Sequence, residues 1–145
     1  MSFRLTDHTA DLGIEADGAS AEEALADAAR GLTAVLCGHR DLHRLGRPDR
    51  ELAFTVEAPD RVALLVAFLS ELLWHFESSD LLWLGGGVSL GTGREGIARL
   101  EARGNAVRHD PARHGRGVEV KAVTYHDVRF EPVGGRWHLR VLLDI

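Results

Sequence analysis

The stretch DRVALLVAFLSELLWHF, residues 60–76, decides the fold more than any other segment of the chain. Its apolar residues recur at three- and four-residue spacing, the period of an amphipathic helix with a broad apolar face. They are Leu64, Leu65, Phe68, Leu69, Leu72, Leu73 and Phe76. Asp60 stands where an N-cap residue is preferred, because its carboxylate can accept a backbone N–H of the first turn. The segment therefore predicts the main core helix.

A second helix is predicted upstream, between Ser20 and Gly38. Residues 20–23, Ser-Ala-Glu-Glu, have the form of a capping box, and apolar residues then recur at helical spacing over about seventeen residues. Gly38 stands where helices commonly end in a left-handed residue. Cys37 is the only cysteine and falls in this apolar stretch. We therefore expect a buried thiol, and neither a disulfide nor a cysteine-rich zinc site.

Alternating apolar residues on either side of these helices predict β-strands. The predicted strand segments are 11–16, 52–56, 81–84 with 88–90, 98–102, 118–130 and 137–143. The last two are joined by Gly134-Gly135, a pair typical of a tight hairpin. The order β-α-β-α-β-β-β-β predicts an α+β fold, with two helices packed on one face of a largely antiparallel sheet. We expect a single domain over residues 1–145.

The long strand over 118–130 carries polar residues that could be functional. Alternation puts His126 on the apolar face, where it is either a core histidine or a catalytic one. Lys121 and Asp127 fall together on the opposite face, where they form a charged patch or simply face solvent.

Composition narrows the functional class. With 45% hydrophobic and 27% charged residues, the chain has the make-up of a globular protein. Seventeen basic and 22 acidic side chains give a net charge of −5, which argues against non-specific binding to phosphate backbones. No apolar stretch reaches the roughly twenty residues of a membrane span, and the start of the chain lacks an apolar signal segment. We expect a cytoplasmic protein whose partner is a protein or a cation.

Motifs for nucleotide hydrolysis and nucleophilic catalysis are absent from the sequence. The glycine run 85–87 lacks the Lys and Ser/Thr of a phosphate-binding loop, and there is no G-x-S-x-G turn.

Oxygen ligands gather at two places that are far apart in the sequence. Asp11 begins the strand 11–16, and Asp144 and Ile145 stand last. If the chain ends at Ile145, its α-carboxylate is ionised at neutral pH and lies one residue from the Asp144 carboxylate. A hard divalent cation such as Ca²⁺ or Mg²⁺ relieves the repulsion between close carboxylates. Asp11 completes this cluster if the first and last strands are neighbours; otherwise Asp11 is a turn residue and the terminus is only solvated.

Three separated motifs together resemble the archease family. They are DHTADLGIEA at 7–16, VKAVTYHD at 120–127 and the terminal DI at 144–145. The resemblance covers nearly the whole chain, including the helix over 63–73, whereas the glycine-rich stretch 84–94 matches no motif of the family.

The resemblance implies a function for these residues. It implies an accessory protein, not itself an enzyme, that activates an RtcB-type RNA ligase in tRNA splicing and RNA repair by promoting ligase guanylylation and multiple turnover. It also implies a divalent cation, most often calcium, with Mg²⁺ or Mn²⁺ as alternatives, held by Asp11, Asp144 and the carboxylate of Ile145. The implied fold is α+β with a strand-helix-strand-strand module.

Three further residues match the family's central motif, Lys121, His126 and Asp127, and are candidates for ligase activation. Contact with tRNA or broken RNA would then be indirect, through the ligase.

Two other functions stay open at the level of sequence. A metal-dependent hydrolase could use Asp11, Asp144 and His126, and it would turn over substrate without a partner. The second open function is that of a general chaperone or RNA-binding module. The net charge and the lack of a basic aromatic surface argue against direct RNA contact.

Overall fold

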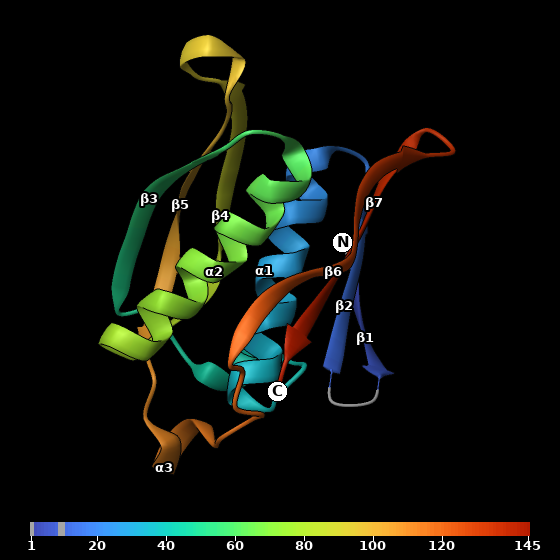
Figure 1. Cartoon of the computed structure of the whole chain (residues 1–145). Helices are drawn as coiled ribbons and strands as arrows, with labels where there is room; N and C mark the ends of the chain where they lie inside the picture. The colour runs from blue at the N-terminus through green and yellow to red at the C-terminus, as the bar shows by residue number, and fades with distance from the viewer. Residues whose placement is uncertain (1, 9–10) are drawn as a thin grey trace.

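The computed structural model describes residues 2–8 and 11–145 and contains two antiparallel sheets with two long helices (Figure 1). The four-stranded sheet has the order β1-β2-β7-β6, with β1 Ser2–His8, β2 Asp11–Gly18, β7 Arg136–Asp144 and β6 Ala122–Val133. The three-stranded sheet has the order β3-β5-β4, with β3 Arg50–Ala58, β5 Ala98–Arg108 and β4 Leu81–Thr92. The predicted α+β class, strand and helix order and antiparallel pairing are confirmed.

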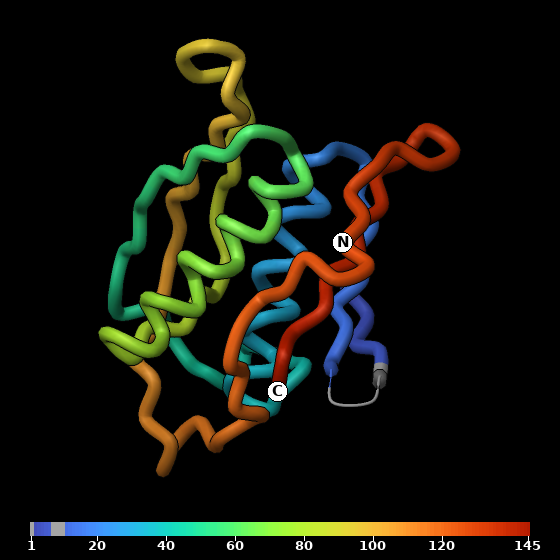
Figure 2. Tube along the Cα trace, in the orientation of Figure 1, coloured from blue at the N-terminus to red at the C-terminus, as the bar shows by residue number. Residues whose placement is uncertain are grey.

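The helices lie between the two sheets, which differs from the predicted packing on one face of a single sheet. Helix α1, Ala21–Cys37, contacts β1, β2 and β7 on one side and β4 on the other. Helix α2, Arg61–Ser79, contacts β6 and all three strands of the smaller sheet, and Figures 1 and 2 show both helices in the middle of the molecule. The reason is the surface of α1, which is buried nearly all round and so requires cover on more than one side.

The predicted helix ends are confirmed by their hydrogen bonds. The Ser20 hydroxyl accepts the Glu23 N–H at 3.1 Å, and Asp60 Oδ1 accepts the Ala63 N–H at 2.8 Å. The Glu23 carboxylate reaches back to the Ala19 N–H, at 2.6 Å, one residue before the expected Ser20 N–H. Gly38 is left-handed, with φ 80°. Local chemistry therefore fixes where these helices begin and where α1 stops.

By length and composition alone, α2 is apolar enough to cross a membrane. Leu64, Leu65, Phe68 and Leu69, however, are at most 2% exposed and lie in the protein's core cluster. The core helix of a globular domain passes the same test of length and composition, so α2 is assigned to the core, as its sequence predicted.

The glycine-rich stretch 84–94 forms most of β4 and the turn after it. The register of β4 against β5 shifts between Trp83 and Gly85. Beyond the shift Gly86 pairs with Gly104, and a Cβ on either would collide with the backbone of the other strand. The chain then turns through a short 3-10 helix, η2 Arg94–Gly96, into β5.

Strand β1 and a break in β6 were not predicted. The signal for β1 is the pair Phe3 and Leu5, whose side chains pack against the core from alternate positions. In β6, pairing with β7 stops after Thr124 and resumes at Arg129, so four residues of β6 lie opposite Val141 alone. The expected continuous strand over 118–130 is therefore wrong, because an irregularity in the middle changes which side chains face the core.

Candidate functional site

Asp11 and Asp144 lie directly opposite each other at one end of the β2–β7 pair. The antiparallel pairing of β2 with β7 places Asp11 opposite Asp144. On the other side of β7, the pairing with β6 places Ala122 opposite the same residue. Side chains of directly opposite residues leave the same face of a sheet with Cβ atoms about 5 Å apart. The first strand predicted from the sequence, now β2, is thus a neighbour of the last strand, β7, which is the condition that the sequence set for the carboxylate cluster.

Neighbouring residues fix the position of the last residues of β7 at this end of the sheet. The Lys121 N–H donates to the Asp144 carbonyl at 2.7 Å, so Lys121 lies beside Asp144 although it precedes β6. The side chain of Ile145 packs against the core cluster, which fixes the residue after Asp144. The structure therefore brings four of the predicted residues, Asp11, Lys121, Asp144 and Ile145, to one place.

The donor set fits a hard cation. Among the described residues no three His, Cys, Asp or Glu side chains come close enough to hold a metal ion. The predicted set differs from such a cluster, since it has two side-chain carboxylates and takes its third oxygen ligand from the carboxylate of Ile145. Oxygen donors without nitrogen or sulfur suit Ca²⁺ or Mg²⁺.

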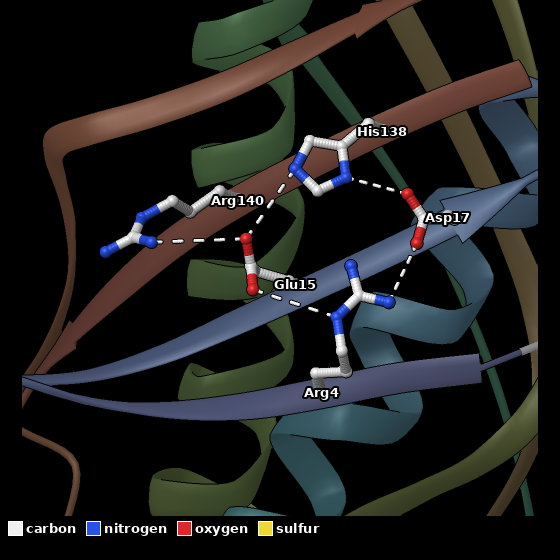
Figure 3. Close-up of polar contacts among 5 residues, drawn as sticks. All are labelled: Arg4, Glu15, Asp17, His138 and Arg140. Atoms are coloured by element: carbon white, nitrogen blue, oxygen red, sulfur yellow. Dashed lines mark hydrogen bonds and ion pairs between the residues drawn. The ribbon is translucent and has the colours of Figure 1, made fainter. Parts of the chain in front are cut away.

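Farther along the same strand pair, carboxylates face cations instead. Glu15 pairs in register with Arg140, and Asp17 pairs with His138. Figure 3 shows how Arg4 of β1 joins them, with Nη1 2.9 Å from Asp17 Oδ2 and Nε 3.7 Å from Glu15 Oε2. His138 lies between the two carboxylates, 2.7 Å from Asp17 Oδ1 and 3.7 Å from Glu15 Oε1.

These contacts change the acidity of Asp17. The hydrogen bond with His138, more than that with Arg4, holds the pKa of Asp17 below its usual 3.8 despite some loss of hydration. Sequence analysis missed this charged network. Glu15 and Asp17 alternate with the apolar residues of β2, but their partners follow only from the strand register.

His126 and Asp127 lie in the irregular part of β6. Both side chains are more than half exposed, and His126 Nε2 is 3.5 Å from Asp127 Oδ2. Asp127 is left-handed, with φ 52°. The expectation that His126 lies on the core face is therefore wrong, because the break in pairing interrupts the alternation of side chains. Lys121 and Asp127 are both exposed, in agreement with the alternative that they face solvent.

Comparisons with known proteins agree on one family over the whole chain. A model of the Archease protein family (MTH1598/TM1083) matches residues 3–145. "Protein archease" of Methanosarcina mazei is 32% identical over 143 residues, covering 99% of this chain and 95% of that protein. "Protein archease" of Pyrococcus furiosus is 34% identical over 140 residues, covering 96% and 95%.

Solved structures share the fold. The solution structure of protein 1598 of Methanobacterium thermoautotrophicum superposes with a TM-score of 0.80 at 30% identity, covering 99% of this chain and 98% of that one. The crystal structure of a Thermotoga maritima protein, described as an archease and possible chaperone, gives a TM-score of 0.56 at 21% identity, covering 98% and 96%. At that identity the second match shows a common fold alone.

Proposed function

The chain belongs to the archease family, and on that premise we propose that it activates an RtcB-type RNA ligase in tRNA splicing and RNA repair. The chain would act in the cytoplasm by promoting ligase guanylylation and multiple turnover, without catalysing a reaction itself. The names of its relatives support this reading, because they are called archease rather than after a reaction.

The observation that carries the proposal is the pairing of Asp11 with Asp144. Two carboxylates directly opposite each other in a sheet repel. A divalent cation, most favourably Ca²⁺, would neutralise these two carboxylates and leave an acidic tip when the Ile145 carboxylate is the third ligand. Mg²⁺ and Mn²⁺ are alternatives, because both accept carboxylate oxygens.

The residues around this tip have separate roles in the proposal. Asp11, Asp144 and Ile145 hold the cation, and Lys121, anchored to Asp144 through its backbone, adds positive charge beside it. The tip would enter the ligase active site, where the positive charge of Lys121 would help to place GTP phosphates. His126 and Asp127 are exposed farther along β6 and would contact the ligase rather than the cation.

A reconstituted ligase tests the proposal. Ligase, GTP, Mn²⁺ and RNA are mixed with the wild-type chain or with Asp144→Ala, and guanylylated ligase is measured over time. We expect Asp144→Ala to lose the stimulation. The matched control is Asp17→Ala, which removes an aspartate that the protein already neutralises and should keep the stimulation. Equal stimulation by wild type and Asp144→Ala contradicts the role of the tip.

Removing Ile145 tests the third ligand. The deletion moves the free carboxylate onto Asp144 and takes away the side chain that packs on the core. We expect weaker Ca²⁺ binding in a calorimetric titration, with the melting temperature reporting any general loss of structure. Unchanged affinity contradicts a ligand at the end of the chain.

The hydrolase alternative receives no support from the position of His126. That side chain lies in the break of β6, exposed and paired with Asp127, rather than on the predicted core face. Turnover of a phosphoester by the purified chain with metal, in the absence of ligase, would overturn the proposed non-catalytic role. A chaperone role predicts suppression of ligase aggregation that Asp144→Ala retains.

A further inference from the structure

Seven arginines lie in two short segments, residues 39–50 and 108–116, here named the basic lobe. The segments contain three aspartates and no Lys or Glu, so the lobe carries +4 while the whole chain carries −5 and the remainder therefore −9. They contact each other through η1, Leu42–Leu45, and the short helix α3, Pro111–His114. His39 Nε2 donates to the His114 carbonyl at 2.6 Å, which ties the two segments together.

The arginines of the lobe are poorly neutralised by the protein itself. Six are exposed and form no ion pair with any residue that the structure describes: Arg40, Arg44, Arg47, Arg108, Arg113 and Arg116. On the sheets, Arg4, Arg99 and Arg140 each reach a carboxylate, whereas Arg129 and Arg136 are exposed and form no ion pair with a described residue. The lobe is distinguished by having its unpaired arginines in two segments that contact each other.

The aspartates of the lobe are already used by the backbone. Asp41 and Asp110 cap η1 and α3, accepting the His43 and Ala112 N–H groups at 3.1 Å. Asp49 accepts the Arg108 N–H at 3.1 Å. Asp49 also lies 3.8 Å from Arg50, but with seven arginines and three aspartates in the lobe most of the guanidinium charge has no partner.

Three of the six arginines, Arg47, Arg108 and Arg113, line one open groove of about 670 Å³. His114, only 3% exposed, lies at its wall. Its Nδ1 accepts the Asp110 N–H at 3.0 Å, so the neutral ring carries its proton on Nε2. That Nε2 is buried without a hydrogen-bond partner among the described residues. A buried donor without an acceptor is uncommon, and an ordered water or an ion can supply the missing acceptor.

We propose that the basic lobe binds the phosphate backbone of a single-stranded nucleic acid. A phosphate would occupy the groove, where guanidinium groups can contact its oxygens in pairs. Arg40, Arg44 and Arg116 would contact neighbouring phosphates. An acidic protein surface fits less well, because protein interfaces depend on apolar anchors. The exposed large apolar side chains, Trp74, Val118, Tyr125 and Val133, all lie outside the two segments.

The lobe adjoins the Asp11–Asp144 end of the sheet. From Arg116 the chain runs past the end of α1, where the Val118 N–H donates to the Val35 carbonyl, and reaches Asp144 at Lys121. Figure 1 shows α3 and the C-terminus at the same end of the molecule. A bound strand would thus run beside the candidate cation tip. The lobe itself is independent of the ligase proposal, because it needs neither cation nor ligase.

Fluorescence anisotropy with labelled RNA and DNA 20-mers tests the lobe. We expect micromolar binding that weakens about 16-fold between 50 and 200 mM salt, as about three phosphate contacts require for a single strand. Similar affinity for the two polymers supports recognition of the backbone, and tighter binding of RNA adds a contact to its 2′-hydroxyl.

A matched pair of triple variants locates the site. Arg47→Glu/Arg108→Glu/Arg113→Glu should lose at least tenfold in affinity and flatten the salt dependence. Arg94→Glu/Arg129→Glu/Arg136→Glu changes the net charge equally at exposed positions outside the lobe, and it should lose less than threefold. Arg94 and Arg136 belong to the hairpin ends on the far side of the molecule (Figure 1). Circular dichroism checks folding, and the milder Arg→Gln triple repeats the test if the Glu triple unfolds.

Three results would overturn the proposal. They are wild-type binding without salt dependence, an equal loss in the two Glu triples, and displacement of RNA by poly-glutamate at an equal concentration of charge. The last result would assign the lobe to an acidic protein.

Discussion

Strands β2 and β7 hold carboxylates in two contrasting ways along a single register. In the middle of the pair, Glu15 faces Arg140 and Asp17 faces His138. At the end of the pair, Asp11 faces Asp144. Opposite charges across a strand pair stabilise a sheet by a few tenths of a kcal/mol to about 1 kcal/mol, and like charges destabilise it by a similar amount.

The contrast separates charges that stabilise the fold from charges that are candidates for binding. A network whose members already neutralise each other gains little from a ligand. A like-charged pair is stabilised by any cation that binds to it. The repulsion that destabilises the free protein is relieved in the bound form, and this relief adds to the affinity for the cation. The basic lobe is a second concentration of like charge, of the opposite sign, in which six of seven arginines form no ion pair with a described residue.

Reversing one charge at the end of the pair gives the largest expected effect. Asp144→Arg would turn the Asp11 pair into an opposite-charge pair like that of Glu15 and Arg140. We expect the affinity for Ca²⁺ to fall at least 100-fold, about 2.7 kcal/mol, while the melting temperature in EDTA stays equal or rises. Calorimetry and thermal melts measure the two effects. Arg140→Gln is the control and should bind Ca²⁺ with wild-type affinity. If Asp144→Arg also binds Ca²⁺ with wild-type affinity, the two ends of the strand pair do not differ in cation binding and the comparison fails.

Asp27 extends the comparison to a buried carboxylate. It lies on α1 and is 0% exposed, and the charge of Arg30 nearby offsets only part of the cost of burial. Burial raises the pKa of Asp27 above 3.8, so the folded protein keeps a proton that the unfolded chain releases. Stability is therefore lost as the pH rises from 3.8 through the higher pKa of the folded state.

Asp27→Asn removes that dependence on pH. We expect the variant to be more stable than wild type by about 1–2 kcal/mol at pH 7, with the gain shrinking toward pH 4, since each pH unit between the two pKa values costs about 1.4 kcal/mol. Urea unfolding at several pH values measures this. Glu22→Gln on the same helix should change stability by less than about 0.5 kcal/mol. A gain that does not vary with pH would contradict the account.

The smallest expected effect comes from the neutralised network. Because the pKa of Asp17 is lowered, its contribution to stability is present above 3.8 and is lost as the pH falls through the value in the folded state. Asp17→Asn should cost about 0.5–1 kcal/mol at pH 7, an amount limited by solvent, and progressively less in acid. Urea unfolding from pH 7 to about pH 3 follows the difference. If the loss of stability in Asp17→Asn is the same at about pH 3 as at pH 7, the variant loses packing rather than a charge interaction.

Much of the fold could be predicted because it depends on local chemistry. Ser20, Gly38 and Asp60 marked helix ends through hydrogen bonds to nearby backbone groups. The apolar stripe of α2 marked the core in the same way, since its period is a property of the helix alone.

The break in β6 could not be predicted from the same rules. Alternation assumes an unbroken strand, and four residues of β6 opposite Val141 end the alternation without a glycine or proline to announce it. His126 was misplaced for this reason. The division into two sheets could not be predicted for a related reason, because strand pairing joins residues that are far apart in the chain.

The sequence by itself determined both long helices, all strands but β1, and the residues of the candidate cation site, because motifs and periodicity are written along the chain. Only the tertiary structure decided which charges face one another. It set Asp11 against Asp144, gave Glu15 and Asp17 their cations, and collected the arginines of two distant segments into one lobe. A net charge is a sum over residues, whereas binding depends on where those residues lie, and their positions are fixed by strand register and packing.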